Sequence, residues 1–217
     1  MMKKIKIGCY MVGMIQTNVY FLHREDSGDT IVVDPADYGK ELNEELSRQG
    51  LTVRAILLTH GHFDHILGAE ALREASGAPI YASAMEKDLL LDPELNTSNQ
   101  IGRSCRIKAD HYLIDGESVT AAGITLKMIL TPGHTEGSCC YFISAEESGG
   151  DPILLSGDTL FEESVGRTDL PTGDTYDLTE SIRTKLYVLP DNTAVYSGHT
   201  GPTTIGHEKK YNYFVHE

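Results

Sequence analysis

The sequence predicts an α/β fold made of two halves of related design, and three observations support this class. Short aliphatic or alternating runs, typical of strands, are interleaved with segments whose apolar residues recur at helical spacing. In both halves, a histidine or aspartate stands beside glycine just after a strand-like run. The chain has 217 residues, which is enough to bury a substantial core. We therefore expect residues 1–217 to form a single domain of two αβ halves.

The first third of the chain alternates like a sheet and then becomes helical. Three strands are predicted here: Lys3 to Cys9, Asn18 to Arg24 and Thr30 to Val33. Glu25 to Asp29 forms the hairpin turn between the last two strands, and Asp34-Pro35 ends this unit. A helix is predicted over Gly39 to Gln49, because apolar and charged residues recur there at helical spacing, and it stops at Gly50, the usual left-handed cap residue.

The next unit is a strand from Val53, a loop rich in histidine and a helix. The helix is predicted to run to Ser76, with Gly77 as its cap, and a strand follows over Pro79 to Ala82. Ser83-Ala84-Met85-Glu86 has the spacing of a capping box and predicts the start of one more helix.

The stretch from Leu91 to Asp110 is the least regular part of the sequence. Its proline, asparagines and glycine break any periodicity, so it is expected to leave the core as a surface excursion. Two interpretations stay open: a segment that flanks or covers a site, and a solvated connector.

The second half repeats the design of the first without repeating its residues. Its predicted strands are Ile124 to Leu130, Cys139 to Ile143, Ile153 to Leu155 and Ala194 to Ser197. Ala145 to Asp151 is predicted to be a polar turn between two of them. Asp174 to Val188 is predicted to be an amphipathic helix with Asp174 at its N-cap.

The stretch Thr59-His60-Gly61-His62-Phe63-Asp64-His65 carries the strongest chemical signal. A single histidine at a strand end is usually an ordinary surface or core residue. Three imidazoles and a carboxylate within six positions would repel or compete for partners, and a metal relieves both costs. Zinc and similar divalent ions bind imidazole nitrogen and carboxylate oxygen, and Gly61 allows the flanking histidines to point the same way.

Three later residues stand in similar places, each beside glycine at the end of a strand-like run. They are His134, Asp158 and His199, and each alone would be weak evidence. The candidate metal ligands are therefore His60, His62, Asp64, His65, His134, Asp158 and His199. Seven groups are too many for one tetrahedral ion and suit two ions that share a carboxylate, which we expect to be Asp158.

Composition limits the classes of partner and the compartment. The formal net charge of −14 argues against nucleic acid and anionic membrane surfaces as partners. The N-terminal run is interpreted as a strand rather than a secretory signal, and no stretch is long enough to span a bilayer, so a cytoplasmic location is expected. The four cysteines show no metal-finger spacing and are expected to be ordinary thiols, with the neighbours Cys139 and Cys140 pointing to opposite faces.

The ordered set of motifs resembles the metallo-β-lactamase superfamily, in the subset related to glyoxalase II. The resemblance covers nearly the whole chain. Besides the first histidine cluster, it includes Thr131-Pro132-Gly133-His134-Thr135, Ser156-Gly157-Asp158-Thr159-Leu160-Phe161, Gly166-Arg167-Thr168-Asp169-Leu170 and Ser197-Gly198-His199.

The resemblance implies a four-layer αββα sandwich with a dinuclear metal site at one edge of its sheets. By position, His60, His62 and His134 would hold the first ion, Asp64, His65 and His199 the second, and Asp158 would bridge them. Asp64 is also taken as the catalytic carboxylate. Zinc is the expected metal, with iron or manganese as alternatives. The chain ends about where the helical C-terminal domain of full-length glyoxalase II enzymes would begin, so no such domain is expected.

The activity implied is hydrolysis of a small thioester such as S-D-lactoylglutathione, or of another thiol conjugate, by a hydroxide that bridges the two metals. A first alternative is a persulfide dioxygenase, which would use one iron held by His60, His134 and Asp158. A second alternative is a non-catalytic, metal-stabilised binding module. Arg167 lies two residues from Asp169, and we expect an internal ion pair rather than a contact with a substrate carboxylate. The oligomeric state stays open.

Overall fold

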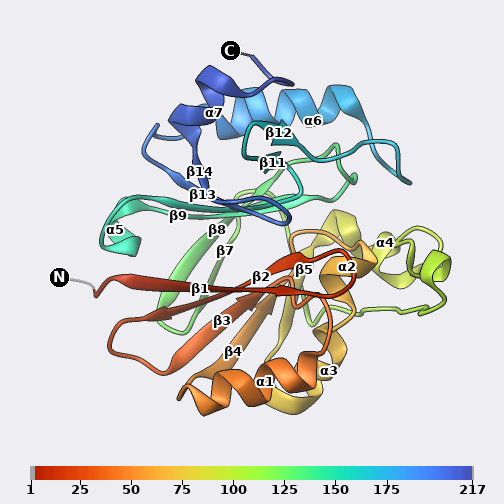
Figure 1. Cartoon of the computed structure of the whole chain (residues 1–217), viewed down its shortest axis with the longest axis vertical. Coiled ribbons are helices and arrows are strands. Elements are labelled where there is room, and N and C mark those ends of the chain that lie inside the picture. Colours follow the sequence, from red (N-terminus) through yellow and green to blue (C-terminus); the bar gives the residue numbers. More distant parts are fainter. Residues whose placement is uncertain (1–2, 217) are drawn as a thin grey trace.

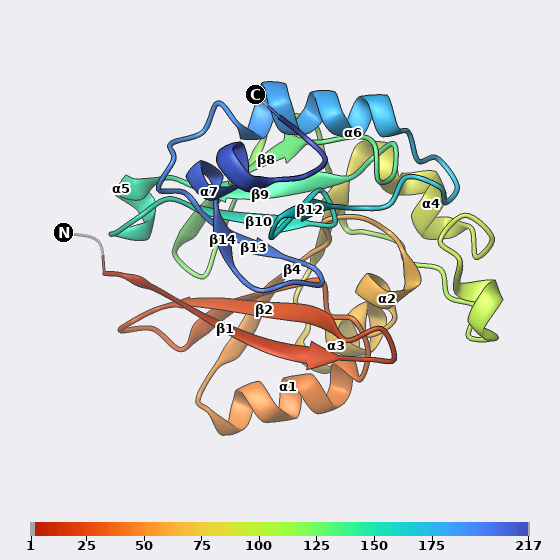
Figure 2. The ribbon, with the colours of Figure 1, turned by 45° about the horizontal axis from the view of Figure 1, so that its top comes forward.

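The structure, a computed structural model, describes residues 3–216 and arranges them in four layers (Figures 1 and 2). Two six-stranded sheets face each other in the middle. Helices α1 (Gly39–Arg48) and α3 (Ala69–Ser76) cover the outer face of one sheet, and α6 (Thr175–Ser181) and α7 (Ile205–Tyr211) cover that of the other. The predicted αββα sandwich is therefore confirmed.

The first sheet contains its strands in sequence order. They are β1 (Ile5–Val12), β2 (Thr17–Arg24), β3 (Asp29–Val33), β4 (Thr52–Leu57), β5 (Ile80–Ser83) and β6 (His111–Leu113). The first three strands are antiparallel, and β3 to β6 are parallel to one another. Parallel neighbours need crossover connections, and helices α1 and α3 supply two of them.

The second sheet has the order β14-β13-β10-β9-β8-β7. Its strands are β7 (Ser118–Ala121), β8 (Ile124–Leu130), β9 (Cys139–Ile143), β10 (Ile153–Gly157), β13 (Ala194–Ser197) and β14 (Thr203–Thr204). All its pairs are antiparallel except β10 with β13, which run parallel. A separate two-stranded ribbon contains β11 (Leu160–Phe161) and β12 (Ser164–Val165).

Three hydrophobic clusters fill the three interfaces between the four layers. The first, with Leu46 and Leu72, packs α1 and α3 on the first sheet. The second lies between the sheets, and the third, with Leu178, packs α6 on the second sheet. Cys139 belongs to the middle cluster and its neighbour Cys140 to the outer one, so the expectation of opposite faces is confirmed. All four cysteines are free thiols.

The helix predicted after the histidine loop is interrupted, which corrects the expectation of one continuous helix. The segment after the histidine loop forms α2 (Phe63–Ile66) and then α3, and Gly68 lies between the two helices. A Cβ atom on Gly68 would lie 2.0 Å from the carbonyl oxygen of Pro35, and one on Gly39 would lie 2.0 Å from the carbonyl oxygen of Gly68. The break therefore lets Gly68, the residue before α3, contact the backbone of Gly39 at the start of α1.

Other differences concern short elements. The predicted turn between β9 and β10 contains the single helical turn α5 (Ala145–Ser148), capped by Ser144. The predicted helix over Asp174 to Val188 has Asp174 at its N-cap, as expected, but continues after α6 as a π-helical turn, Ile182–Leu186. The prediction did not include β6, β7, β11, β12, β14 or α7.

The Leu91 to Asp110 excursion is partly buried and flanks the histidine loop. It follows the 3₁₀ turn Ala84–Glu86 and helix α4 (Lys87–Leu91), and it contains the 3₁₀ turn Ser98–Ile101. The carbonyl oxygen of Asn96 accepts a hydrogen bond from the amide of Phe63 at 2.9 Å. Of the two open interpretations, the flanking segment is therefore correct. Among the described residues, no helix is both long and apolar enough to cross a bilayer.

Candidate metal centre

All seven predicted ligand residues converge at one edge of the two sheets. The loop after β4 carries the first histidines, and Asp64 and His65 lie on the short helix α2. His134, Asp158 and His199 follow β8, β10 and β13, three strands of the second sheet. Both halves therefore contribute to one site. The amide of Cys139 ties them together by donating to the carbonyl oxygen of Thr59 at 2.9 Å.

The first triad consists of His60, His62 and His134, all fully buried. His62 Nδ1 lies 2.8 Å from His134 Nε2, and His134 Nε2 lies 3.2 Å from His60 Nε2. Three ring nitrogens therefore face one point, which is the ligand set expected for a zinc-type ion.

The second triad consists of Asp64, His65 and His199. His199 Nε2 lies 3.3 Å from both His65 Nε2 and Asp64 Oδ2. Asp158 faces both triads, because its Oδ2 lies 3.3 Å from His199 Nε2 and 3.6 Å from His134 Nε2. Its position is the one that a shared ligand would need.

The proton positions implied by outer contacts support metal binding at the first triad. His134 Nδ1 lies 2.7 Å from the carbonyl oxygen of Arg167, which can only accept, so His134 Nε2 has a free lone pair. Thr59 Oγ1 donates to Asp34 at 2.6 Å and accepts from His60 Nδ1 at 3.1 Å, so His60 Nε2 also presents a lone pair. Two lone pairs 3.2 Å apart cannot hydrogen-bond to each other, and a cation between them satisfies both.

The surroundings of Asp158 also indicate that the site binds metal. It is 8% exposed, and its Oδ1 atom makes no hydrogen bond among the described residues, although His65 Nε2 lies 3.4 Å from it. A buried carboxylate oxygen without a hydrogen bond costs free energy, and a cation bound there would remove that cost. The side chains present therefore fit a pair of divalent ions.

The two triads differ in their electrostatics in the metal-free protein. Burial, and then the neighbouring His134, lower the pKa of His62 to about 3, and burial also lowers the pKa of His60 and His134. Burial opposes the charged form of His199 too, but hydrogen bonds to Asp158 and Asp64 outweigh it and raise its pKa to about 9. The first triad is thus a set of neutral imidazoles, whereas in the second triad the carboxylates of Asp158 and Asp64 favour the protonated forms of His65 and His199.

Asp34 supports the site and was not among the predicted site residues. It is buried after β3, and its carboxylate accepts from Thr59 and lies 2.9 Å from His65 Nδ1. A carboxylate on the outer nitrogen of a ligand histidine fixes which ring nitrogen faces the metal. A signal did exist, because Asp34 precedes proline directly after an apolar strand, much as the predicted ligands stand beside glycine.

Glu86 is the second supporting residue that the prediction missed. Ser83 caps the turn that follows it, but Glu86 does not return to the Ser83 backbone, so the capping-box prediction is only half correct. The Glu86 side chain instead enters the interior, where Oε1 accepts from the amide of Gly61 at 2.8 Å and both oxygens accept from Thr135 Oγ1.

Burial raises the pKa of Glu86 from 4.5 to about 7, which predicts a pH-dependent stability. A raised folded-state pKa contributes stability that is complete below pH 4.5 and is lost as the pH rises to about 7. We expect the free energy of unfolding of the wild type, relative to E86Q, to fall by about 3 kcal/mol across this interval and then to level off. Urea unfolding of the wild type and E86Q between pH 4 and 8 measures this fall. A difference in free energy of unfolding that does not change with pH would contradict the prediction.

The metal-ligand cluster opens into a hollow of about 390 Å³. Apart from the proposed ligands, its walls are mostly apolar, with Ile15, Phe63 and Phe161 among them. Thr97 of the excursion also lines it. Arg167 reaches the hollow, and it forms the expected ion pair with Asp169, with nitrogen–oxygen distances of 2.7 and 2.8 Å.

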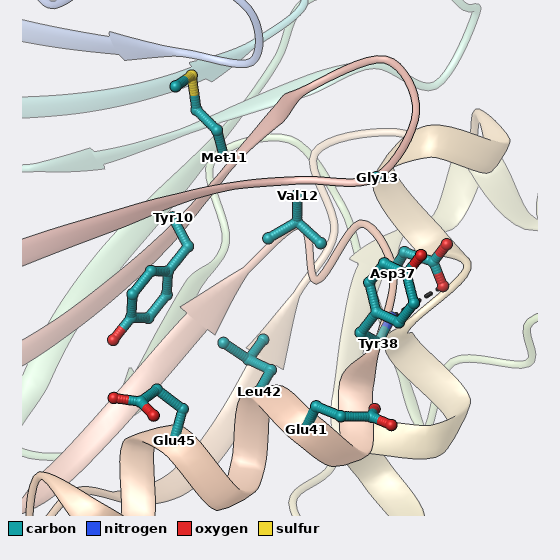
Figure 3. Close-up of a pocket in the computed structure, with 9 residues that line it drawn as sticks. All are labelled: Tyr10, Met11, Val12, Gly13, Asp37, Tyr38, Glu41, Leu42 and Glu45. Carbon is teal, nitrogen blue, oxygen red and sulfur yellow. Dashed lines mark hydrogen bonds between the residues drawn. The ribbon is translucent and has the colours of Figure 1, made fainter.

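A second hollow of about 400 Å³ lies between the end of β1 and helix α1 (Figure 3). Tyr10 and Val12 extend from β1 toward Leu42, Glu41 and Glu45 of α1, and all five residues line the hollow. Its lining contains neither histidine nor cysteine. The hollow beside the histidines is therefore the candidate active site, although the two are similar in size.

Comparison with known protein families gives one clear match. The sequence profile described as "Metallo-beta-lactamase superfamily" matches residues 12–199. The chain is 38% identical to "Probable metallo-hydrolase YqgX" of Bacillus subtilis (strain 168), over 94% of each protein. It is 35% identical to "Hydroxyacylglutathione hydrolase GloC" of Haemophilus influenzae, over 88% of this chain and 89% of that protein.

Solved structures with the same fold cover almost the whole chain. The crystal structure of BLEG-1 B3 metallo-beta-lactamase is 41% identical, with a TM-score of 0.89 over 97% of this chain and 99% of that one. TTHA1623, solved in a di-iron-bound form, is 30% identical, with a TM-score of 0.82 over 96% of this chain and 100% of that one.

Proposed function

This chain belongs to the metallo-β-lactamase superfamily, and on that premise we propose that it is a metal-dependent hydrolase that cleaves a small thioester. The names of the relatives, a probable metallo-hydrolase and a hydroxyacylglutathione hydrolase, support the hydrolase class. The observation that carries the proposal is the convergence of two ligand triads and Asp158 beside one hollow.

We propose that the first triad holds one divalent ion, the second triad holds another, and Asp158 contacts both. Bound there, the ions would supply a water molecule of lowered pKa and would polarise the substrate carbonyl. Zinc is the proposed metal, and iron fits the same donor set. The proposed catalytic carboxylate is Asp64, whose Oδ2 accepts a hydrogen bond from Thr17 Oγ1 at 3.1 Å and which lines the hollow.

The walls of the hollow favour a thioester over substrates with poorer leaving groups. Apart from the proposed ligands and Arg167, no residue in the described lining carries a titratable side chain, so no separate general acid is present there. A thiolate needs little acid assistance to leave, whereas an amine or alkoxide needs a proton. Apolar walls that include Val165 and Leu170 suit a small acyl group.

A substrate panel on protein with quantified metals tests this proposal. We expect turnover of small thioesters, including S-D-lactoylglutathione, to exceed that of lactones and phosphoesters at equal metal content. Chelation of the metal should abolish this turnover, and addition of zinc should restore it. No turnover of any of these classes, with a melting temperature that falls when metal is removed, would instead favour a metal-stabilised binding module.

One geometric observation favours a second candidate, a persulfide dioxygenase with one iron. His60, His134 and Asp158 lie together, with 3.2 Å between the histidine nitrogens and 3.6 Å from His134 Nε2 to Asp158 Oδ2. One ion could therefore use these three residues alone. Oxygen uptake with glutathione persulfide separates this candidate from the hydrolase.

Arg167 gives a prediction of small effect. Its side chain is 61% exposed and its guanidinium is already paired with Asp169, and exposed ion pairs contribute only about 0–1 kcal/mol. We expect R167A to change kcat/KM for a neutral thioester by no more than about fivefold. The carbonyl oxygen that accepts from His134 remains in this variant. A loss above about a hundredfold would show that Arg167 binds the substrate.

A further inference from the structure

We propose that Glu86 is a positioning residue for the first metal site and that it acts by tying together the two loops that carry the first triad. This proposal rests on the proposed metal pair. It does not depend on the proposed substrate, because the experiment that tests it measures metal binding.

The geometry joins parts of the chain that come from different sheets. Gly61, whose amide donates to Glu86 at 2.8 Å, lies between His60 and His62 on the first-sheet side. Thr135, whose hydroxyl lies 2.9 and 3.0 Å from the two carboxylate oxygens, directly follows His134 on the second-sheet side. One carboxylate therefore holds both loops through hydrogen bonds to residues next to the ligand histidines.

The Glu86 carboxylate is buried and tightly packed between the two loops. Glu86 is 1% exposed, and the Gly61 amide has no other acceptor among the described residues. A Cβ atom on Gly61 would lie 2.7 Å from Leu89 Cδ2, and one on Gly137 would lie 2.2 Å from Glu86 Oε2. The carboxylate thus sits in a close-fitting cradle, and its removal would leave a buried amide without a partner.

The second triad is anchored by other residues. Thr17 Oγ1 donates to Asp64 Oδ2, and Asp34 contacts His65 Nδ1. Within the described chain, the Glu86 carboxylate accepts no hydrogen bond from a residue of the second triad. Loss of Glu86 should therefore weaken one metal site and spare the other.

Two backgrounds that each retain one site give the test. H199A removes a ligand of the second site, and H62A removes one of the first. We expect E86A to weaken Zn²⁺ binding by about 10–100-fold in the H199A background, measured by chelator competition, and to leave it within about threefold in the H62A background. E86Q keeps an oxygen acceptor for Gly61 and a donor for Thr135, so it should restore most of the affinity.

Matched controls separate positioning from general damage. T17V, which acts on Asp64, should show the reverse pattern and weaken Zn²⁺ binding only in the H62A background. T135V removes the hydroxyl that donates to Glu86. It should weaken Zn²⁺ binding at the first site and so tests the proposal even if E86A folds poorly. An equal loss from E86A in both backgrounds, or none in H199A, would overturn the assignment. If neither background binds Zn²⁺, the proposed metal pair itself is wrong, and the role of Glu86 is wrong with it.

Discussion

Replacing Asp158 with asparagine is expected to abolish turnover and to lower the metal content below two ions per chain. Asp158 is the one proposed ligand that faces both triads, with Oδ2 at 3.3 Å from His199 Nε2 and 3.6 Å from His134 Nε2. Asparagine keeps the shape but removes the negative charge that two cations would share. Because metal assistance contributes several kcal/mol, kcat/KM for a thioester should fall by about a thousandfold or more.

Asp169→Asn is the matched control for this variant. Asp169 is an exposed carboxylate that pairs with Arg167 near the same hollow and contacts neither triad in the described structure. We expect D169N to keep wild-type metal content and activity within about fivefold. Metal analysis, kinetics and circular dichroism of both variants provide the measurement. Full metal content and turnover in D158N would show that Asp158 does not bridge.

Gly198→Ala is expected to have the second large effect, by steric displacement inside the site. A Cβ atom at Gly198 would lie 2.1 Å from Asp158 Oδ1 and 2.8 Å from His65 Cε1, so both side chains would have to move. We expect the second metal to be lost and kcat/KM to fall by at least about a hundredfold. The free energy of unfolding should fall by about 1–3 kcal/mol, the usual cost of overpacking.

Gly201→Ala tests the same loop without the clash. A Cβ atom there would approach only Glu162 Oε2, at 3.2 Å, and that is the end of a flexible side chain. G201A should therefore keep both metals and nearly full activity. If G198A behaves like G201A, Asp158 does not pack tightly against this loop.

The fold and the ligand residues could be predicted because local signals coincide with them. Buried strands appear as short aliphatic runs, and the predicted bounds of β8, β9 and β13 agree with the structure. Each proposed ligand outside the first cluster stands beside glycine just beyond a strand. Strands that carry such residues can end at a common sheet edge, which is where the structure places them.

The supporting residues could not be predicted in this way, because their partners are distant in sequence. Glu86 contacts Gly61 and Thr135, which lie 25 and 49 positions away. Its local spacing from Ser83 favoured a helix cap, and tertiary hydrogen bonds to two loops replaced that role. The two-residue strands β11, β12 and β14 were missed for a similar reason, since pairing with a neighbour rather than periodicity defines them.

We propose that one site holds two metal ions for hydrolysis, and metal analysis of the purified chain is the decisive test of this proposal. Elemental analysis combined with anomalous diffraction should find two ions per chain, one at His60, His62 and His134 and one at Asp64, His65 and His199. Oxygen uptake with glutathione persulfide should be absent. A single iron held by His60, His134 and Asp158, together with oxygen consumption, would show that the chain is a dioxygenase and not a dinuclear hydrolase.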